Sequence, residues 1–292
     1  PVNLGNSGTS MRLLTGVAAL GRGKCRLTGT DRMHRQPIGD LLDALRLLGV
    51  DAQSEKNNGC PPVVIQGGGI VKDRTRVKCS MSSQYLSSLL LIAPKTEKGM
   101  TIAVVSDLVS RPYVDMTLDI MAHMGISASH ENYQKFIVPG NQIYRQGAYQ
   151  VEPDCSQAGY FWAMAAVTKN RIKVCGITPE TRQGDVCFAG VLGRMGCGVE
   201  YEKDGIAVTG GPLSGITVDM GQMPDIVPTL AVVAAFAQGT TVIRNVAHLK
   251  AKESDRLEAT AAELNRIGID ARASADGLVI KGGTPHGGRI KT

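Results

Sequence analysis

The 292-residue sequence contains few aromatic side chains and no long apolar run. Aromatic residues make up only 4% of the chain, so its cores must be built mainly from aliphatic side chains. The longest mostly apolar stretch, residues 227–237, is far shorter than the roughly 18 residues that span a membrane. The chain does not open with a basic segment followed by an apolar one. We therefore expect neither a membrane protein nor a secretory signal.

Cysteine and histidine are too sparse for several classes of site. The 7 cysteines are odd in number, lie far apart and never form a CxxC motif, and the 5 histidines are scattered. This distribution disfavours a disulfide framework or a metal site and is typical of reduced thiols in the cytoplasm. The net charge of +6 is compatible with an anionic small-molecule ligand or with a basic patch.

One amphipathic pattern occurs four times along the chain. Each copy predicts a helix with apolar residues three or four positions apart, closed by a glycine in the left-handed C′ position and followed by two strands. The closing glycines are Gly49, Gly125, Gly196 and Gly268, so consecutive copies are 76, 71 and 72 residues apart. Such regular spacing indicates an internal repeat.

A second series of four segments alternates with the first. Each begins with small polar residues, continues almost wholly apolar and leads to a short strand, which predicts a helix buried inside a domain. These segments are residues 8–20, 82–93, 156–167 and 225–237. Together the two series predict an α/β protein with two domains, residues 1–149 and 150–292, and a strand near residues 147–151.

Polar residues at the start of these helices are the first candidates for chemistry. Gly8 follows Gly5 closely, so a ligand could approach the backbone and the N–H groups of the helix start. Ser82, Ser83 and Gln84 offer two hydroxyls and an amide at a helix N-terminus, a combination that suits a phosphate group. Ordinary helix capping is the alternative interpretation of both segments.

Charged residues begin the last two helices. Asp225 is either a simple N-cap or a general base that the helix N-terminus keeps ionised. Lys250, Lys252 and Arg256 crowd one short segment, and Lys252 and Arg256 would repel each other on one helix face. A bound anion would relieve this repulsion, whereas the alternative is a charged loop in solvent.

Six segments together resemble the 5-enolpyruvylshikimate-3-phosphate synthase family, in the family's order and spacing. They are Leu4–Arg12, Arg32–Gly39, Ser82–Leu86, Ser110–Tyr113, Met223–Asp225 and Lys252–Leu257. The resemblance implies the enolpyruvyl transferase fold, an α/β architecture of the inside-out barrel type with two domains of repeated βαβαββ units, of which four of six are present. It also implies an enzyme of aromatic amino-acid biosynthesis, in a family that is the target of the herbicide glyphosate. That enzyme moves the enolpyruvyl group of phosphoenolpyruvate to the 5-hydroxyl of shikimate 3-phosphate without a metal or organic cofactor.

The resemblance further implies a role for each matching residue. Shikimate 3-phosphate would be bound by Ser82, Ser83, Gln84, Ser110, Tyr113, Asp225, His248 and Lys252. Phosphoenolpyruvate would be bound by Gly8, Arg35, Gln84 and Arg256. Asp225 would take the proton of the 5-hydroxyl, and Glu253 would exchange a proton with the methylene carbon. The family's arginine before Pro-Ile is Gln36 here, so either Arg35 replaces it or one contact is weakened.

Two parts of the family's pattern are absent from this sequence: an N-terminal Lys, Ser and Arg, and a later Asp-His-Arg motif with a Lys. We therefore expect this chain alone, as a monomer, to bind its two small-molecule substrates weakly and to turn over little. The alternatives are a UDP-N-acetylglucosamine enolpyruvyl transferase, a non-catalytic fragment, and a nucleic-acid-binding protein with similar repeats. The scarcity of aromatic residues and the low net charge argue against a nucleic-acid partner.

Overall fold

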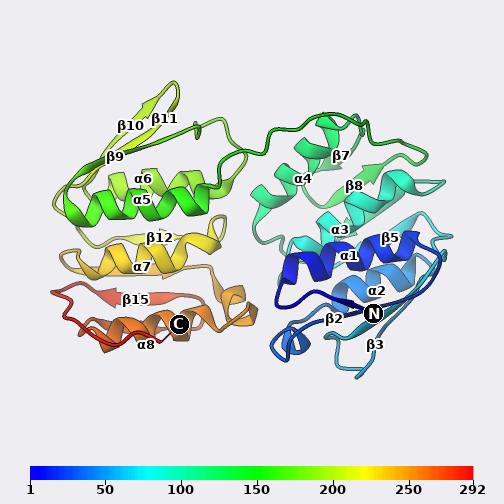
Figure 1. The fold of residues 1–292 in the computed structure, drawn as a ribbon, viewed down its shortest axis with the longest axis horizontal. Coiled ribbons are helices and arrows are strands. Elements are labelled where there is room, and N and C mark those ends of the chain that lie inside the picture. The colour runs from blue at the N-terminus through cyan, green and yellow to red at the C-terminus, as the bar shows by residue number, and fades with distance from the viewer. Residues whose placement is uncertain (292) are drawn as a thin grey trace. The chain divides into compact units, whose positions relative to one another are not determined.

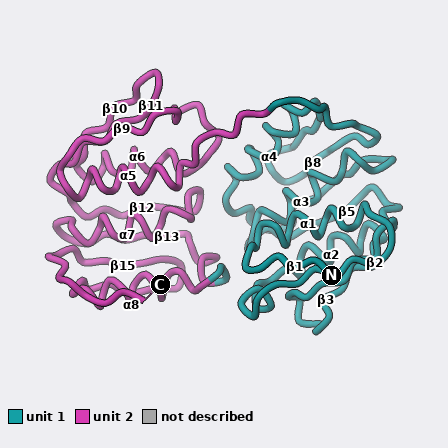
Figure 2. The backbone as a smooth tube through the Cα atoms, in the orientation of Figure 1, with its two compact units in different colours: residues 1–148, 251–253 teal, residues 149–250, 254–292 magenta. Residues whose placement is uncertain are grey.

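The computed structural model describes Pro1–Lys291 and divides into two compact units, each described by itself. Unit 1 comprises Pro1–Ala148 and Ala251–Glu253, and unit 2 comprises Tyr149–Lys250 and Ser254–Thr292 (Figure 2). The sequence-based boundary placed residues 251–253 in the second domain. They group instead with unit 1, where the Arg32 guanidinium donates a hydrogen bond to the carbonyl of Lys252.

Unit 1 contains two consecutive βαβαββ repeats (Figure 1). The first consists of β1 (Val2–Asn3), α1 (Gly8–Leu20), β2 (Gly23–Thr28), α2 (Gly39–Leu47), β3 (Asp51–Ser54) and β4 (Val63–Gly67). The second consists of β5 (Arg74–Val77), α3 (Gln84–Ile92), β6 (Met100–Val104), α4 (Arg111–His123), β7 (Ser129–Glu131) and β8 (Lys135–Val138). Each repeat forms a four-stranded sheet, ordered β1-β2-β4-β3 or β5-β6-β8-β7, in which only the first pair is parallel.

Unit 2 also contains two repeats, but the first lacks its opening strand. That repeat consists of α5 (Cys155–Thr168), β9 (Arg171–Cys175), α6 (Phe188–Arg194), β10 (Gly198–Glu202) and β11 (Gly205–Thr209), with the antiparallel strand order β10-β11-β9. The last repeat consists of β12 (Thr217–Asp219), α7 (Val227–Ala235), β13 (Thr240–Arg244), α8 (Arg256–Arg266), β14 (Asp270–Ala273) and β15 (Leu278–Lys281). Its sheet, β12-β13-β15-β14, repeats the pairing pattern of unit 1. The predicted α/β class with four repeated units is confirmed, whereas the strand near residues 147–151 is not formed.

Four glycines end the surface helices with one geometry. Gly49, Gly125, Gly196 and Gly268 have φ angles of 97°, 80°, 113° and 84°, in the left-handed region that glycine adopts without steric cost. The residue after each glycine donates a backbone hydrogen bond to the carbonyl five residues earlier, as in a Schellman motif. The repeat that the glycine spacing predicts is thus confirmed in the hydrogen bonds of the backbone.

Helices α1 and α3 of unit 1 pack side by side in the same direction. Contacts join the start of α1 to the start of α3, through Thr9 and Gln84, and join their middles, where a Cβ on Gly16 would lie 2.3 Å from Ser88 Oγ. Ser88 Oγ also donates a hydrogen bond of 2.8 Å to the carbonyl of Arg12. The N-termini of the two helices therefore lie at the same end of the pair.

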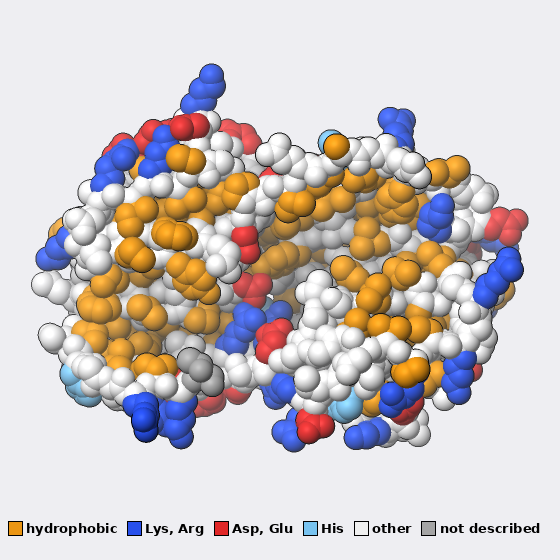
Figure 3. Space-filling model, in the orientation of Figure 1, with side chains coloured by type: hydrophobic (Ala, Val, Ile, Leu, Met, Phe, Trp, Pro, Cys, Tyr) orange, Lys and Arg blue, Asp and Glu red, His pale blue; other side chains and the backbone are white. Residues whose placement is uncertain are grey.

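The prediction that all four apolar helices are buried is only partly correct. Helix α3 is buried along almost its whole length, but α1, α5 and α7 each expose apolar side chains. Tyr160 and Met164 of α5 and Val232 of α7 are 56%, 52% and 50% exposed. They line an apolar groove of about 460 Å³, on a face where Figure 3 shows many hydrophobic side chains.

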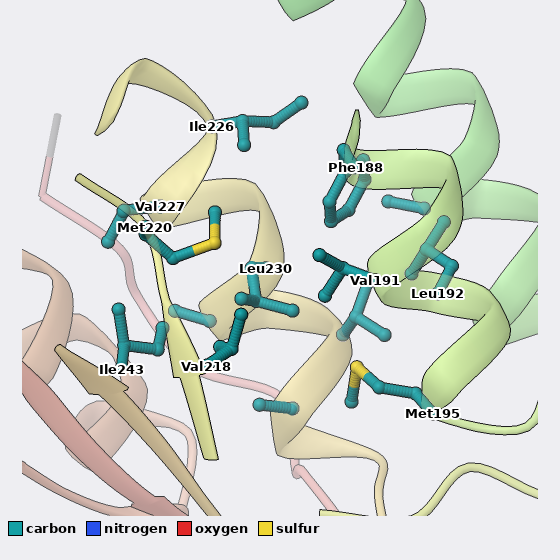
Figure 4. Close-up of a cluster of buried hydrophobic side chains, with 14 of the residues drawn as sticks. Phe188, Val191, Leu192, Met195, Val218, Met220, Ile226, Val227, Leu230 and Ile243 are labelled. Atoms are coloured by element: carbon teal, nitrogen blue, oxygen red, sulfur yellow. The ribbon is translucent and has the colours of Figure 1, made fainter. Parts of the chain in front are cut away.

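Each unit has its own largely aliphatic core, as the scarcity of aromatic residues predicts. Figure 4 shows part of the core of unit 2, where Val191 of α6 lies beside Leu230 of α7. Trp162, the single tryptophan of the chain, is fully buried in α5 and donates its indole N–H to the carbonyl of Ile206. Among residues 1–291, no helix has the length and apolar character needed to cross a membrane.

Candidate active site

Gln84 joins the adjacent N-termini of α1 and α3 in unit 1. Its Nε2 donates a hydrogen bond of 2.9 Å to Thr9 Oγ1, and its Oε1 accepts one of 2.8 Å from Nη1 of Arg12. Neither helix has an acidic residue in its first turn. The partial positive charge of the two N-termini is therefore not neutralised by carboxylates of the helices themselves, which favours the binding of anions.

The two serines before α3 have different surroundings. Ser82 Oγ accepts a hydrogen bond of 3.2 Å from the backbone N–H of Gln84, so it caps the helix. Ser83 occupies the N-cap position itself but makes no side-chain capping hydrogen bond. Helix capping therefore accounts for one of the two hydroxyls and leaves Ser83 available for another role.

Ser110 and Tyr113 lie at the start of α4, in the second repeat of unit 1. Ser110 is buried and has a φ of 53°, a left-handed conformation that is uncommon for residues other than glycine. Its carbonyl accepts a hydrogen bond of 3.2 Å from the N–H of Tyr113. Such backbone conformations concentrate at binding and catalytic sites, because the surrounding structure must hold them in place.

A buried guanidinium lies next to the N-termini of α1 and α3. Arg12 is 5% exposed, and its Nη2 donates a hydrogen bond of 3.3 Å to Oε1 of Gln36. Gln36 is 2% exposed, whereas Arg35 is exposed at the end of the 3-10 turn η1 (Met33–Arg35). The extended backbone after this turn carries Gln36 inward and leaves Arg35 in solvent. Arg12, and not the predicted Arg35, is therefore the cation beside Gln36.

In unit 2, Asp225 lies in the 3-10 turn η4 (Pro224–Ile226) directly before α7. Its carboxylate accepts a hydrogen bond of 2.6 Å from Nη1 of Arg256, the first residue of α8. Asp255 caps α8 and accepts hydrogen bonds of 3.1 Å from the N–H groups of Leu257 and Glu258. Asp225 is thus half of a charge-assisted pair and is not the helix N-cap that the alternative interpretation expected.

A second carboxyl group interacts with Asp225. Asp185 lies in the 3-10 turn η3 (Gly184–Cys187) and is 5% exposed. Its Oδ2 accepts a hydrogen bond of 2.5 Å from Ser156 Oγ, and its Oδ1 has no hydrogen-bond partner among the described residues. Burial raises the pKa of Asp185 to about 6, against the opposing effect of the Ser156 hydrogen bond, and the charges of Asp225 and Asp154 raise it further. A carboxyl group of this kind changes protonation close to neutral pH, as acid–base groups of enzymes do.

The basic segment before α8 is not part of that helix. His248 is buried in the 3-10 turn η5 (Ala247–Ala251), Lys252 and Glu253 follow without helical structure, and α8 begins only at Arg256. Lys252 and Arg256 therefore do not share a helix face, and the repulsion inferred from helical spacing does not arise. Within residues 1–291, no three His, Cys, Asp or Glu side chains are grouped to hold a metal ion.

The predicted site residues are divided between the units. Unit 1 contains Gly8, Arg35, Ser82, Ser83, Gln84, Ser110, Tyr113, Lys252 and Glu253. Unit 2 contains Asp225, His248 and Arg256. Within unit 1, Arg12 lies against Gly8 and donates a hydrogen bond to Gln84. Within unit 2, Arg256 donates a hydrogen bond to Asp225.

A sequence profile described as EPSP synthase (3-phosphoshikimate 1-carboxyvinyltransferase) matches residues 1–292. The chain belongs to the EPSP synthase family. The protein named 3-phosphoshikimate 1-carboxyvinyltransferase from Methanococcoides burtonii is 43% identical over 295 residues, which cover 99% of this chain and 68% of that protein. The protein of the same name from a Marinomonas species is 43% identical over 95% of this chain and 65% of its own length.

Solved structures of EPSP synthases have the same fold. An EPSP synthase structure from Acinetobacter baumannii matches with a TM-score of 0.74 and 29% identity, over 96% of this chain and 64% of that one. The predicted enolpyruvyl transferase fold is thereby confirmed. The chain spans about two thirds of the length of these EPSP synthases.

Three polar residues near the site were not among the predicted EPSP synthase site residues. Arg12 and Gln36 lie in segments that resemble the family, and Gln36 departs from its pattern, but only the fold shows that these two side chains meet. Asp185 follows a glycine in a short turn, and its sequence neighbours give no sign that it is buried beside Ser156.

Proposed function

We propose that this chain binds shikimate 3-phosphate and phosphoenolpyruvate and contributes to the transfer of the enolpyruvyl group. In this reaction the 5-hydroxyl oxygen of shikimate 3-phosphate bonds to C2 of phosphoenolpyruvate, and inorganic phosphate leaves. The observation that carries the proposal is the pair of parallel helix N-termini in unit 1, which Gln84 joins and which lack acidic residues. Such an arrangement suits two ligands that both carry phosphate.

Shikimate 3-phosphate is assigned to the start of α3 and to the start of α4. Ser83, whose hydroxyl makes no capping hydrogen bond, donates to the phosphate together with Ser82, Gln84 and Ser110. Tyr113 lines the cyclohexene ring of shikimate 3-phosphate. Lys252, His248 and Asp225 contact its hydroxyls in this proposal.

Phosphoenolpyruvate is assigned to Gly8, Gln84 and Arg256. The Arg256 guanidinium offers several N–H donors in a planar fork, and the hydrogen bond to Asp225 uses Nη1. This planar geometry suits the carboxylate group of phosphoenolpyruvate.

The proton transfers are assigned to two carboxylates. Asp225 takes the proton of the 5-hydroxyl group while the hydroxyl oxygen attacks C2 of phosphoenolpyruvate. Glu253 donates a proton to the methylene carbon. When phosphate leaves the tetrahedral intermediate, Glu253 takes a proton back from that carbon, which restores the carbon–carbon double bond. The proton held by Asp225 passes to the leaving phosphate, so both carboxylates return to their starting state. No metal or organic cofactor enters this scheme. We assign the reaction to the cytoplasm, which suits the 7 free cysteines.

Calorimetric titration of the chain with shikimate 3-phosphate and, separately, with UDP-N-acetylglucosamine tests the proposal. We expect only shikimate 3-phosphate to bind and Ser83→Ala to weaken that binding about tenfold, the usual effect of losing a hydrogen bond to a charged group. Ser127→Ala, at an exposed serine of the same unit, is the matched control. Preferential binding of UDP-N-acetylglucosamine, or equal affinity of the Ser83 and Ser127 variants, would contradict the assignment.

A further inference from the structure

The guanidinium of Arg12 is buried without a carboxylate partner. Its hydrogen bonds go to Oε1 of Gln84 at 2.8 Å and to Oε1 of Gln36 at 3.3 Å, and both acceptors are neutral amide oxygens. Among the described residues Arg12 forms no ion pair, and its guanidinium carbon lies over the ring of Tyr85, 5.8 Å from the ring centroid. Burial of a cation without a counter-ion is costly, so this arrangement is unusual unless an anion completes it.

Two further features surround this cation. The Nε2 of Gln36 is buried and has no hydrogen-bond partner among residues 1–291, although Gln36 is only 2% exposed. A Cβ on Gly8 would lie 2.6 Å from Nη1 of Arg12 and 2.8 Å from Oε1 of Gln36. Gly8 therefore allows the guanidinium and the amide to lie directly against the backbone at the start of α1, where N–H groups are available to an anion.

We propose that Arg12 is the cation of an anion-binding pocket formed with Gly8, Gln36 and Gln84, and that this pocket takes a carboxylate or phosphate group of phosphoenolpyruvate. This inference rests on the proposed function and adds Arg12 to its binding residues. It also accounts for Gln36, since the positive charge that this place needs comes from Arg12 on the neighbouring helix and not from Arg35.

The hydrogen bonds indicate how a ligand enters. Gln84 is only partly buried, and its Oε1 occupies one of the positions around the guanidinium that an anionic oxygen would take. A charged oxygen forms a stronger hydrogen bond with a guanidinium than an amide oxygen does, so an entering anion displaces Oε1 of Gln84. The Nε2 of Gln84, which donates to Thr9 in the unliganded chain, is then close enough to turn toward the same anion.

Titrations of the full chain with phosphoenolpyruvate, inorganic phosphate and pyruvate, followed by calorimetry, test the role of Arg12. We expect Arg12→Gln to weaken phosphoenolpyruvate binding about tenfold or more, and Arg12→Lys to weaken it less, because charge is kept while the planar fork is lost. Arg22→Gln, at an exposed arginine of the same unit, changes the net charge equally and should bind as the unmodified chain does. If Arg12→Gln loses affinity for inorganic phosphate but not for pyruvate, Arg12 binds the phosphate group of phosphoenolpyruvate. If it loses affinity for pyruvate but not for phosphate, Arg12 binds the carboxylate group.

Gln36→Glu separates binding from a merely structural role. A carboxylate beside Arg12 supplies the missing counter-ion, so the unliganded variant should melt at a higher temperature than the unmodified chain and should bind phosphoenolpyruvate at least about tenfold more weakly. Unchanged phosphoenolpyruvate affinity in both Arg12→Gln and Gln36→Glu overturns the inference, as does failure of the unmodified chain to bind this ligand. Shikimate 3-phosphate binding, measured in parallel, tests the proposed function separately, because Arg12 is not among the residues assigned to that ligand.

Discussion

Ionisation of Asp185 is expected to destabilise unit 2 at neutral pH. In the folded chain its pKa is about 6, and its ordinary value is 3.8, so the folded state holds the proton more tightly than the unfolded state does. Where the folded state binds more protons, stability falls as the pH rises. The loss of unfolding free energy therefore develops between about pH 4 and pH 6 and is complete above that range. Its full size is about 3 kcal/mol, because each unit of pKa difference between the folded and unfolded states corresponds to about 1.36 kcal/mol.

Asp185→Asn removes this titration while keeping the shape of the side chain. The amide still offers an oxygen to Ser156 Oγ, and any penalty for its new N–H donors does not depend on pH. Between pH 4.5 and pH 7.5 the free energy of unfolding of the variant should therefore rise by about 2 kcal/mol relative to that of the unmodified chain. The difference in unfolding free energy between the variant and the unmodified chain at a single pH is less informative, because it also includes the hydrogen bonds of the new amide.

Urea denaturation at a series of pH values measures this gain. Trp162 is the single tryptophan and lies in α5, whose Ser156 binds Asp185, so its fluorescence reports the unfolding of unit 2. Asp270→Asn, at an exposed carboxylate of β14, is the matched control and should run parallel to the unmodified chain. If the unfolding free energy of Asp185→Asn changes with pH as that of the unmodified chain does, within about 0.5 kcal/mol over this range, the carboxyl is not buried as described and the reasoning is wrong.

Two other substitutions have expected outcomes in unit 2. Gly268→Ala should lower the free energy of unfolding by about 1–2 kcal/mol, because an alanine resists the φ of 84° and its Cβ meets the His286 ring at 2.5 Å; Gly287→Ala, which meets nothing within 4 Å, should not. Val232→Lys should reduce the binding of a hydrophobic dye to the groove between α5 and α7 while changing stability by less than about 0.5 kcal/mol, since Val232 is half exposed. A large loss of stability in the second case would mean that Val232 packs inside a core.

Local chemistry explains which parts of the fold the sequence predicts. The end of α2 and its three equivalents follow from one glycine each, because a left-handed residue both stops the helix and places the next N–H on an orphan carbonyl. The strand near residues 147–151 was wrongly predicted, because strand formation needs a neighbour as well as a suitable segment. Among the described residues, β9 pairs only with β11.

The burial of particular side chains is less predictable than the elements that carry them. An apolar segment such as residues 156–167 predicts a helix, but whether both of its sides are covered depends on distant parts of the chain, and Tyr160 and Met164 are half exposed. The same limit applies to polar residues. Arg12 and Gln36 are 24 positions apart and meet only because α1 and the turn before α2 converge on Gly8.

The two units differ in how their helix N-termini are neutralised, and this difference fits a division of the proposed chemistry between them. In unit 2 the protein supplies its own carboxylates: Asp154 caps α5, Asp255 caps α8, and Asp225 lies directly before α7. These N-termini are less able to attract an external anion, but they hold carboxylates where a proton acceptor is needed. In unit 1 the first turns of α1 and α3 have no acidic residue, and the adjacent cation is Arg12. In the proposed function, the helix N-termini that bind phosphate therefore lie in unit 1 and the base that deprotonates the hydroxyl lies in unit 2, although both arise from the same end of the same repeated unit.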